Sequence, residues 1–220
     1  MRILAIETSS LRGSVALVED ATLAQALEHH RENAHGETIL PLIERAFAEV
    51  GWERGAIDRV AVGIGPGSFT GLRVGIAIAQ GLSEGWGVPL IGVPSLQAMA
   101  LAAPAGAARR CVLLDARKAE LFAAVYARGG DELVSVRLIP AALDAVLALT
   151  APGDVLYVGN GAALLPDLPN VCRGPETDIP HARFIAAAAL TADPAGLVRP
   201  LYVRDAGAVR PVLPENPLGR

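Results

Sequence analysis

The sequence RVAVGIGPGSFTGLRVG, residues 59–75, predicts a buried strand, a tight glycine turn and the start of a helix. The backbone N–H groups of such a turn converge on one spot, which favours an anion. No lysine follows the glycines, so the turn is not a Walker A loop, and Thr70 stands where a G-x-G-x-x-G motif needs its third glycine. The residues alone therefore leave two interpretations, a phosphate site or a tight bend that requires glycine.

The two halves of the chain predict the same order of secondary-structure elements. The first half predicts strands near 3–6, 14–18 and 23–29, a helix at 38–50 capped by Thr38, then the strand, turn and helix at 59–84, a strand at 89–93 and a helix at 95–102. The second half predicts strands near 111–117, 120–126 and 133–138, a helix at 141–149, a strand and glycine turn at 155–161, a helix at 181–192 and a mobile tail at 211–220. We expect an internal duplication with two lobes, residues 1–104 and 105–220, and the C-terminal segment is free to return toward the first lobe.

The composition excludes several classes of protein. Of 220 residues, 52% are hydrophobic and only 19% charged, so the chain can build a core and is not disordered. A net charge of −4 and 4% aromatic residues argue against an autonomous nucleic-acid binder. No window approaches ~18 uninterrupted apolar residues, and the N-terminus does not read as a signal peptide. We expect a cytoplasmic protein whose surplus apolar surface is covered by a partner.

The helix expected at 70–84 supports that view. Gly71, Gly75, Ala79 and Ser83 recur every four residues, a pattern that lets another backbone approach closely. Apolar residues occupy most of the remaining circumference, which is typical of a helix buried on both sides. We interpret the small residues as the contact with a helix of a partner, and the alternative is full burial of this helix within the chain itself.

Few residues predict catalysis or metal binding. Glu7 and Asp115 each end the first strand of a half, and they are either turn-capping carboxylates or ligands of a metal-bound phosphate in one cleft. His29, His30 and His35 lack the spacing of a metal site and are expected to be exposed loop residues. No serine has the context of a hydrolase nucleophile.

The motifs together resemble the TsaB family over nearly the whole chain. The resemblance is carried by LAIETS at 4–9, SVAL at 14–17, HGE at 35–37, VGIGPGSFTGLRVG at 62–75, LIGVPSL at 90–96, DAR at 115–117 and PLYVR at 200–204. It implies an α/β, actin-like (ASKHA, ribonuclease H-like) fold, with two related lobes whose mixed sheets are flanked by helices. It also implies a non-catalytic subunit that scaffolds and activates TsaD, the transferase that places threonylcarbamoyl on adenosine 37 of tRNAs reading codons that begin with A. TsaE is the third component. The resemblance further implies a homodimer when the subunit is alone, and contact with tRNA only through the complex.

The resemblance also predicts which residues are functional and which are degenerate. TsaD carries a metal-binding H-x-E-G-H segment where this chain reads SLQAM at 95–99, so no metal site is expected. Glu7 replaces the Asp of many ASKHA enzymes, no nucleotide lysine is evident, and ATP binding by the isolated subunit is expected to be weak or absent. The candidate vestigial phosphate site is Glu7, Gly65, Gly67 and Ser68, and the expected TsaD-contact residues are Ile39, Ile43, Phe47, Gly71, Gly75, Ile78 and Leu82. The alternatives are an ASKHA-type ATPase or phosphotransferase, or a protease acting on TsaD.

Overall fold

The computed structural model describes residues 1–31, 34–127, 132–138, 142–148, 154–194 and 197–202. Its first lobe is a five-stranded sheet in the order β3-β2-β1-β4-β5. The strands are β1 (Arg2–Glu7), β2 (Gly13–Glu19), β3 (Thr22–His29), β4 (Arg59–Gly63) and β5 (Leu90–Val93). β1 pairs antiparallel with β2 and parallel with β4, so the sheet is mixed.

The second lobe repeats this topology. Its sheet has the order β10-β9-β6-β7-β8, which is the first order read from the other edge. The strands are β6 (Arg109–Arg117), β7 (Glu120–Ala127), β8 (Glu132–Leu138), β9 (Val155–Val158) and β10 (Val171–Cys172). β6 again pairs antiparallel with its hairpin partner β7 and parallel with the later strand β9. The expected ASKHA architecture of two related α/β lobes is therefore confirmed.

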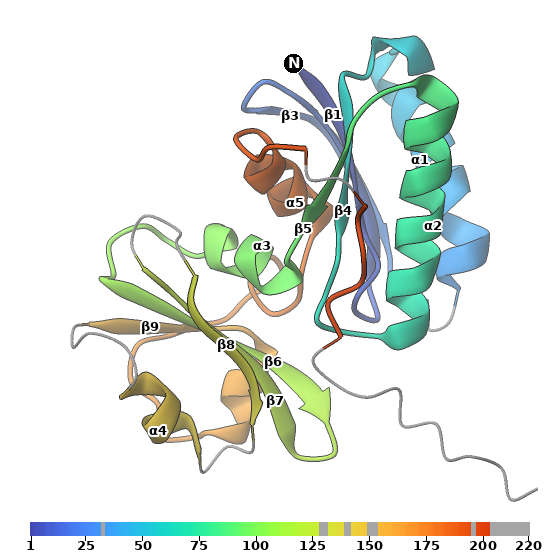
Figure 1. Cartoon of the computed structure of the whole chain (residues 1–220). Helices are drawn as coiled ribbons and strands as arrows, with labels where there is room; N and C mark the ends of the chain where they lie inside the picture. The colour runs from blue at the N-terminus through green and yellow to red at the C-terminus, as the bar shows by residue number, and fades with distance from the viewer. Residues whose placement is uncertain (32–33, 128–131, 139–141, 149–153, 195–196, 203–220) are drawn as a thin grey trace, which may run out of the picture.

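Helices cover both faces of the first sheet (Figure 1). On one face, α1 (His35–Val50) and α2 (Phe69–Trp86) lie side by side and close a core with the strand residues Leu4, Ile6, Val60 and Val62. On the other face lies α5 (Ala182–Ala189), whose Ile185 is buried against Ile3 and Ile91, and α3 (Ser95–Ala102) contacts α5 there. The C-terminal segment thus returns to the first lobe, while the boundary at residue 104 stays a prediction.

Three shorter helices complete the described elements: η1 (Arg54–Ala56), α4 (Leu143–Leu147) and η3 (Asn160–Leu164). Among the described helices, none is both long enough and apolar enough to span a bilayer. The mobile tail expected at 211–220 lies outside the described residues.

The start of α1 differs from expectation. The helix begins at His35, three residues earlier than expected, and Ala34 occupies the N-cap position. Thr38 is therefore inside the helix, where its Oγ1 donates to the Ala34 carbonyl oxygen at 2.7 Å. The sequence did not predict this start, because His35 and Gly36 have low helix propensity.

Candidate functional site

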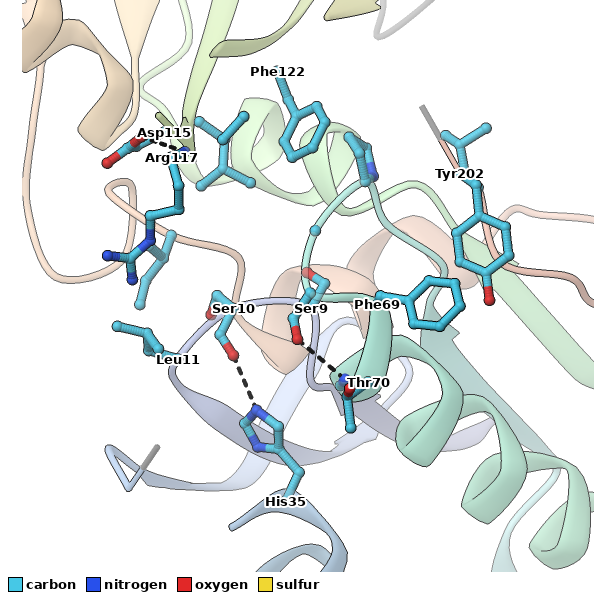
Figure 2. Close-up of a pocket in the computed structure, with 18 of the residues that line it drawn as sticks. Ser9, Ser10, Leu11, His35, Phe69, Thr70, Asp115, Arg117, Phe122 and Tyr202 are labelled. Atoms are coloured by element: carbon cyan, nitrogen blue, oxygen red, sulfur yellow. Dashed lines mark hydrogen bonds between the residues drawn. The ribbon is translucent and has the colours of Figure 1, made fainter. Parts of the chain in front are cut away.

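A cavity of about 770 Å³ lies between the two lobes. One wall comes from the loop after β1, residues Ser9–Leu11, and from the turn and first residues of α2. The opposite wall comes from the β6–β7 hairpin, including Asp115 and Arg117, and from Phe122. Figure 2 shows these side chains facing one another across the cavity, with Tyr202 at its edge. The duplicated lobes therefore place their equivalent first hairpins on a shared cleft.

The glycine turn before α2 is tied directly to the loop after β1. The Ser68 backbone N–H donates to the Ser9 carbonyl oxygen at 2.7 Å, and Ser68 Oγ caps the helix by accepting from the Gly71 N–H at 3.2 Å. A Cβ on Gly67 would overlap Ser9, so glycine is required for this close approach. Gly65 has φ of 98°, a left-handed conformation that favours glycine. Gly67 and Ser68 line the cavity, whereas Gly65 is buried behind it.

Glu7 does not reach the cavity. Its side chain is completely buried, and its carboxylate accepts hydrogen bonds from the Ser9 N–H and, at 2.8 Å, from Ser95 Oγ. Burial raises the pKa of this carboxyl, while the hydrogen bonds from Ser9 and Ser95 and the charge of Arg12 oppose the rise. The carboxylate therefore links β1 to the start of α3, and it is not a wall of the cleft.

Asp115 lies on the cavity wall, so the structure does not bring the two strand-end acids together in one cleft. The Asp115 N–H donates to Asn160 Oδ1 at 2.9 Å, and Asp115 Oδ1 accepts from the Arg117 N–H at 2.7 Å. Arg117, Lys118 and Ala119 all have positive φ, at 66°, 55° and 57°. Such conformations are costly for residues other than glycine and place a tight, basic hairpin at the cavity rim.

Residues 95–99 stand where TsaD carries its metal-binding segment, but in this chain they do not fit a metal. Ser95 is fully buried with its hydroxyl committed to Glu7 and to the Gly65 N–H, and Met99 is fully buried in the core of α3 and the second lobe. No group of three metal-ligating side chains occurs among the residues that the structure describes.

The histidines are arranged differently from the exposed loop cluster that we expected. His30 is exposed, but His35 is only 7% exposed and lies within 3.2 Å of His29, ring nitrogen to ring nitrogen. His35 Nε2 also donates to the Ser10 carbonyl oxygen at 3.0 Å, as Figure 2 shows. His181 is buried as well, and its Nδ1 caps α5 by accepting from the Arg183 N–H.

Most of the expected partner-contact residues face inward. Ile39, Ile43 and Phe47 are buried in the core between α1 and the sheet. Gly71 and Gly75 are buried against Thr8, where a Cβ on either glycine would overlap Thr8 atoms. These five residues are therefore not available to a partner in this structure, which corrects the expectation that the glycine stripe admits a foreign helix.

The opposite face of α2 carries a second stripe of small residues. Ala77, Gly81 and Gly85 are exposed, and a Cβ on either of these glycines would meet nothing within 4 Å. Ile78 and Leu82 lie half-buried beside them, and Leu40 of α1 is 46% exposed. We name this surface the α1–α2 face: Leu40, Ala77, Ile78, Gly81, Leu82 and Gly85. The four-residue spacing from Ala77 would have revealed this second stripe in the sequence, but spacing alone does not tell which of the two stripes is exposed.

Comparison with known proteins agrees with this architecture. Residues 22–195 match the family described as TsaD, tRNA N6-adenosine threonylcarbamoyltransferase. An Escherichia coli protein named tRNA threonylcarbamoyladenosine biosynthesis protein TsaB is 38% identical over 76% of this chain and 75% of its own length. The protein of that name from Haemophilus influenzae is 41% identical, over 47% of this chain and 43% of its own.

A solved structure extends the likeness to nearly the full fold. It is described as an uncharacterized protein with similarity to peptidase YeaZ, from Pseudomonas aeruginosa. It superposes with a TM-score of 0.76 at 26% identity, covering 92% of this chain and 99% of that one. With the duplicated lobes, the glycine turn and the E. coli relative taken together, the chain belongs to the TsaB family.

Proposed function

We propose that this chain is a non-catalytic subunit of the machinery that attaches the threonylcarbamoyl group to adenosine 37 of tRNAs reading codons that begin with A. Relatives named for tRNA threonylcarbamoyladenosine biosynthesis point to a role in that process. In this proposal TsaD performs the transfer in the cytoplasm, TsaE is the third component, and this chain binds TsaD and holds it in an active form. tRNA is contacted through the complex.

The observation that carries the proposal is the α1–α2 face. On α2, the exposed Ala77, Gly81 and Gly85 have side chains so small that the backbone of another helix can approach closely, beside Ile78 and Leu82. Exposed glycines inside a helix cost roughly 0.5–1 kcal/mol each relative to alanine, so a monomer gains nothing from them. The proposed occupant is the corresponding helix pair of TsaD, whose family description this chain also matches and which is therefore expected to present a similar face.

The same face supports a homodimer of the isolated chain. The two occupants compete in this proposal, because one face cannot hold a second copy and TsaD at once. Addition of TsaD is therefore expected to convert the homodimer into a heterodimer.

The cleft supports a subunit without its own phosphotransfer chemistry. Glu7 is sequestered by Ser9 and Ser95 behind the cavity wall, so it is not placed to hold a metal-bound phosphate. The vestigial site that remains is Gly67 and Ser68 at the start of α2. A protease acting on TsaD is not supported, because among the described residues no hydroxyl of a cavity-lining serine is hydrogen-bonded to a histidine ring.

Reconstitution tests the proposal. Purified TsaD, TsaE, tRNA, ATP and the threonylcarbamoyl donor are combined with and without this chain, and modified adenosine is quantified by mass spectrometry. Strong dependence on the chain is expected, and equal modification without it would refute the proposal. Titration of the isolated chain with Mg–ATP distinguishes the proposed subunit from an ATPase or phosphotransferase, because micromolar affinity with turnover would indicate an enzyme.

A further inference from the structure

His29 and His35 form a hydrogen-bonded pair whose proton positions follow from their outer partners. The Arg31 backbone N–H donates to His29 Nδ1 at 3.2 Å, so that nitrogen carries no proton. His35 Nε2 donates to the Ser10 carbonyl oxygen, so Nδ1 of a neutral His35 is an acceptor. The only consistent arrangement has His29 Nε2–H donating to His35 Nδ1, across 3.2 Å. Both rings are neutral in this chain of hydrogen bonds.

Gly13 provides the space in which the two rings meet. A Cβ on Gly13, in β2, would overlap both rings, so glycine at this position makes room for them. Ala34 at the N-cap has no side chain that can accept from the helix, so the start of α1 has no side-chain cap. His35 is the first residue of α1, and its two hydrogen bonds tie the helix start to β3 and to the loop after β1.

A proton added to either ring breaks this chain of hydrogen bonds. Every ring nitrogen already has a partner in the neutral arrangement, so a protonated ring directs one N–H at another donor. A positive charge on His35 would also stand at the N-terminus of α1, where the helix dipole disfavours cations. The pKa of His29 is lowered by burial, then by His35, Arg31 and His30. The charged and titratable groups of the neighbouring elements are Arg12 in the loop after β1, Glu28, His30 and Arg31 at the end of β3, Glu37 in α1, and His181 and Arg183 at the start of α5.

We propose that the His29–His35 pair is a proton-sensitive anchor that holds the first turn of α1, and that protonation of the pair releases this turn and weakens docking of a partner on the α1–α2 face. The second clause rests on the proposed function. Leu40 of that face lies five residues beyond His35 on α1, just after the first turn, so a loosened first turn displaces part of the docking surface.

The anchor is tested first on the isolated chain, by NMR between pH 7.5 and pH 5.5. At pH 7.5 both rings are expected as Nε2–H tautomers. As the pH falls through this range, the hydrogen-exchange protection factors of the Thr38 and Ile39 amides are expected to fall about tenfold or more, with Phe47 at the far end of α1 unchanged. Protection that does not fall across this range would overturn the proposal, and so would rings that are protonated at pH 7.5.

A matched pair of variants assigns the effect to this pair. In His29→Gln the side-chain amide can present either N–H or oxygen to His35, so the contact survives in both charge states and protection should depend on pH less than in the wild type. His30→Gln makes the same substitution at the exposed neighbouring residue and should behave as wild type. An undiminished pH dependence in His29→Gln, or a diminished one in His30→Gln, would contradict the assignment.

The consequence for docking is measured with the TsaD protein of the same genome. Affinity of the wild type is expected to fall about tenfold more than that of His29→Gln between pH 7.5 and pH 5.5, and equal falls would refute the coupling. If TsaD does not bind at any pH, the proposed function fails, and the NMR experiment still decides whether the anchor exists.

Discussion

Thr8 Oγ1 donates a hydrogen bond of 2.8 Å to the carbonyl oxygen of Gly71. Thr8 is fully buried between the end of β1 and the first turns of α2, and a Cβ on Gly75 would overlap the same hydroxyl oxygen. We predict that Gly75→Ala lowers the free energy of unfolding by about 1–3 kcal/mol, because the crowding at Thr8 outweighs the gain in helix propensity. Urea unfolding of the isolated chain measures the change.

Gly81 provides the matched control for that substitution. It lies in the same helix, six residues later, but its position is exposed with nothing within 4 Å of an added Cβ. At a concentration where the chain is monomeric, Gly81→Ala should therefore stabilise it by roughly 0.5–1 kcal/mol. If the two substitutions change the stability by the same amount in the same direction, the inward orientation of the Gly71–Gly75 stripe is wrong.

His181 should make the chain less stable in acid. Burial, followed by the charge of Arg12, lowers its pKa to about 4 in the folded chain, whereas an unfolded histidine titrates near 6.5. The unfolded chain therefore takes up the proton first, and the stability is retained above about pH 6.5 and lost as the pH falls toward 4. The expected loss from this residue is on the order of 2–3 kcal/mol.

His181→Asn isolates that contribution. Asparagine can still accept from the Arg183 N–H at the N-cap but does not titrate, so the stability of the variant should vary less between pH 6.5 and pH 4. Unfolding curves at several pH values give the comparison. Parallel pH profiles of variant and wild type would show that His181 is not the responsible group.

The contribution of Glu7 to the stability should have the opposite pH dependence. Its pKa is raised in the folded chain, chiefly by burial, so its contribution to stability is present below the ordinary pKa near 4.5 and is lost as the pH rises through the folded value. Glu7→Gln stays neutral and can still accept from Ser9 and donate to the Ser95 hydroxyl. The stability of the variant relative to wild type should increase with pH by roughly 1.4 kcal/mol for each unit between the two pKa values. A relative stability that does not change with pH would contradict the raised pKa.

Much of the fold could be predicted from the sequence because it is encoded in local patterns. Two related lobes were predicted from the apolar strands, the glycine turn at 63–71 and the repeated order of elements. The matching strand orders of the two sheets confirm this prediction. The start of α1 was missed because its anchor is a contact between His35 and His29, which no local pattern reveals.

The orientation of α2 could not be predicted for a related reason. Small residues recur at a spacing of four both from Gly71 and from Ala77, and period alone does not say which set meets the sheet. The choice is made by Thr8, a residue far away in sequence whose side chain occupies the space above Gly75. The same limit applies to Glu7, whose partner Ser95 is 88 residues away.

The most direct test of the account is the affinity of this chain for TsaD when the α1–α2 face carries an arginine. Ala77→Arg places a long charged side chain on the exposed stripe with little cost in helix propensity, and Ala163→Arg makes the same change on an exposed position of η3 in the second lobe. We predict that Ala77→Arg lowers the affinity at least about a hundredfold, measured by calorimetry with circular dichroism as a check of folding, while Ala163→Arg binds as wild type. Undiminished binding by a folded Ala77→Arg variant would contradict it.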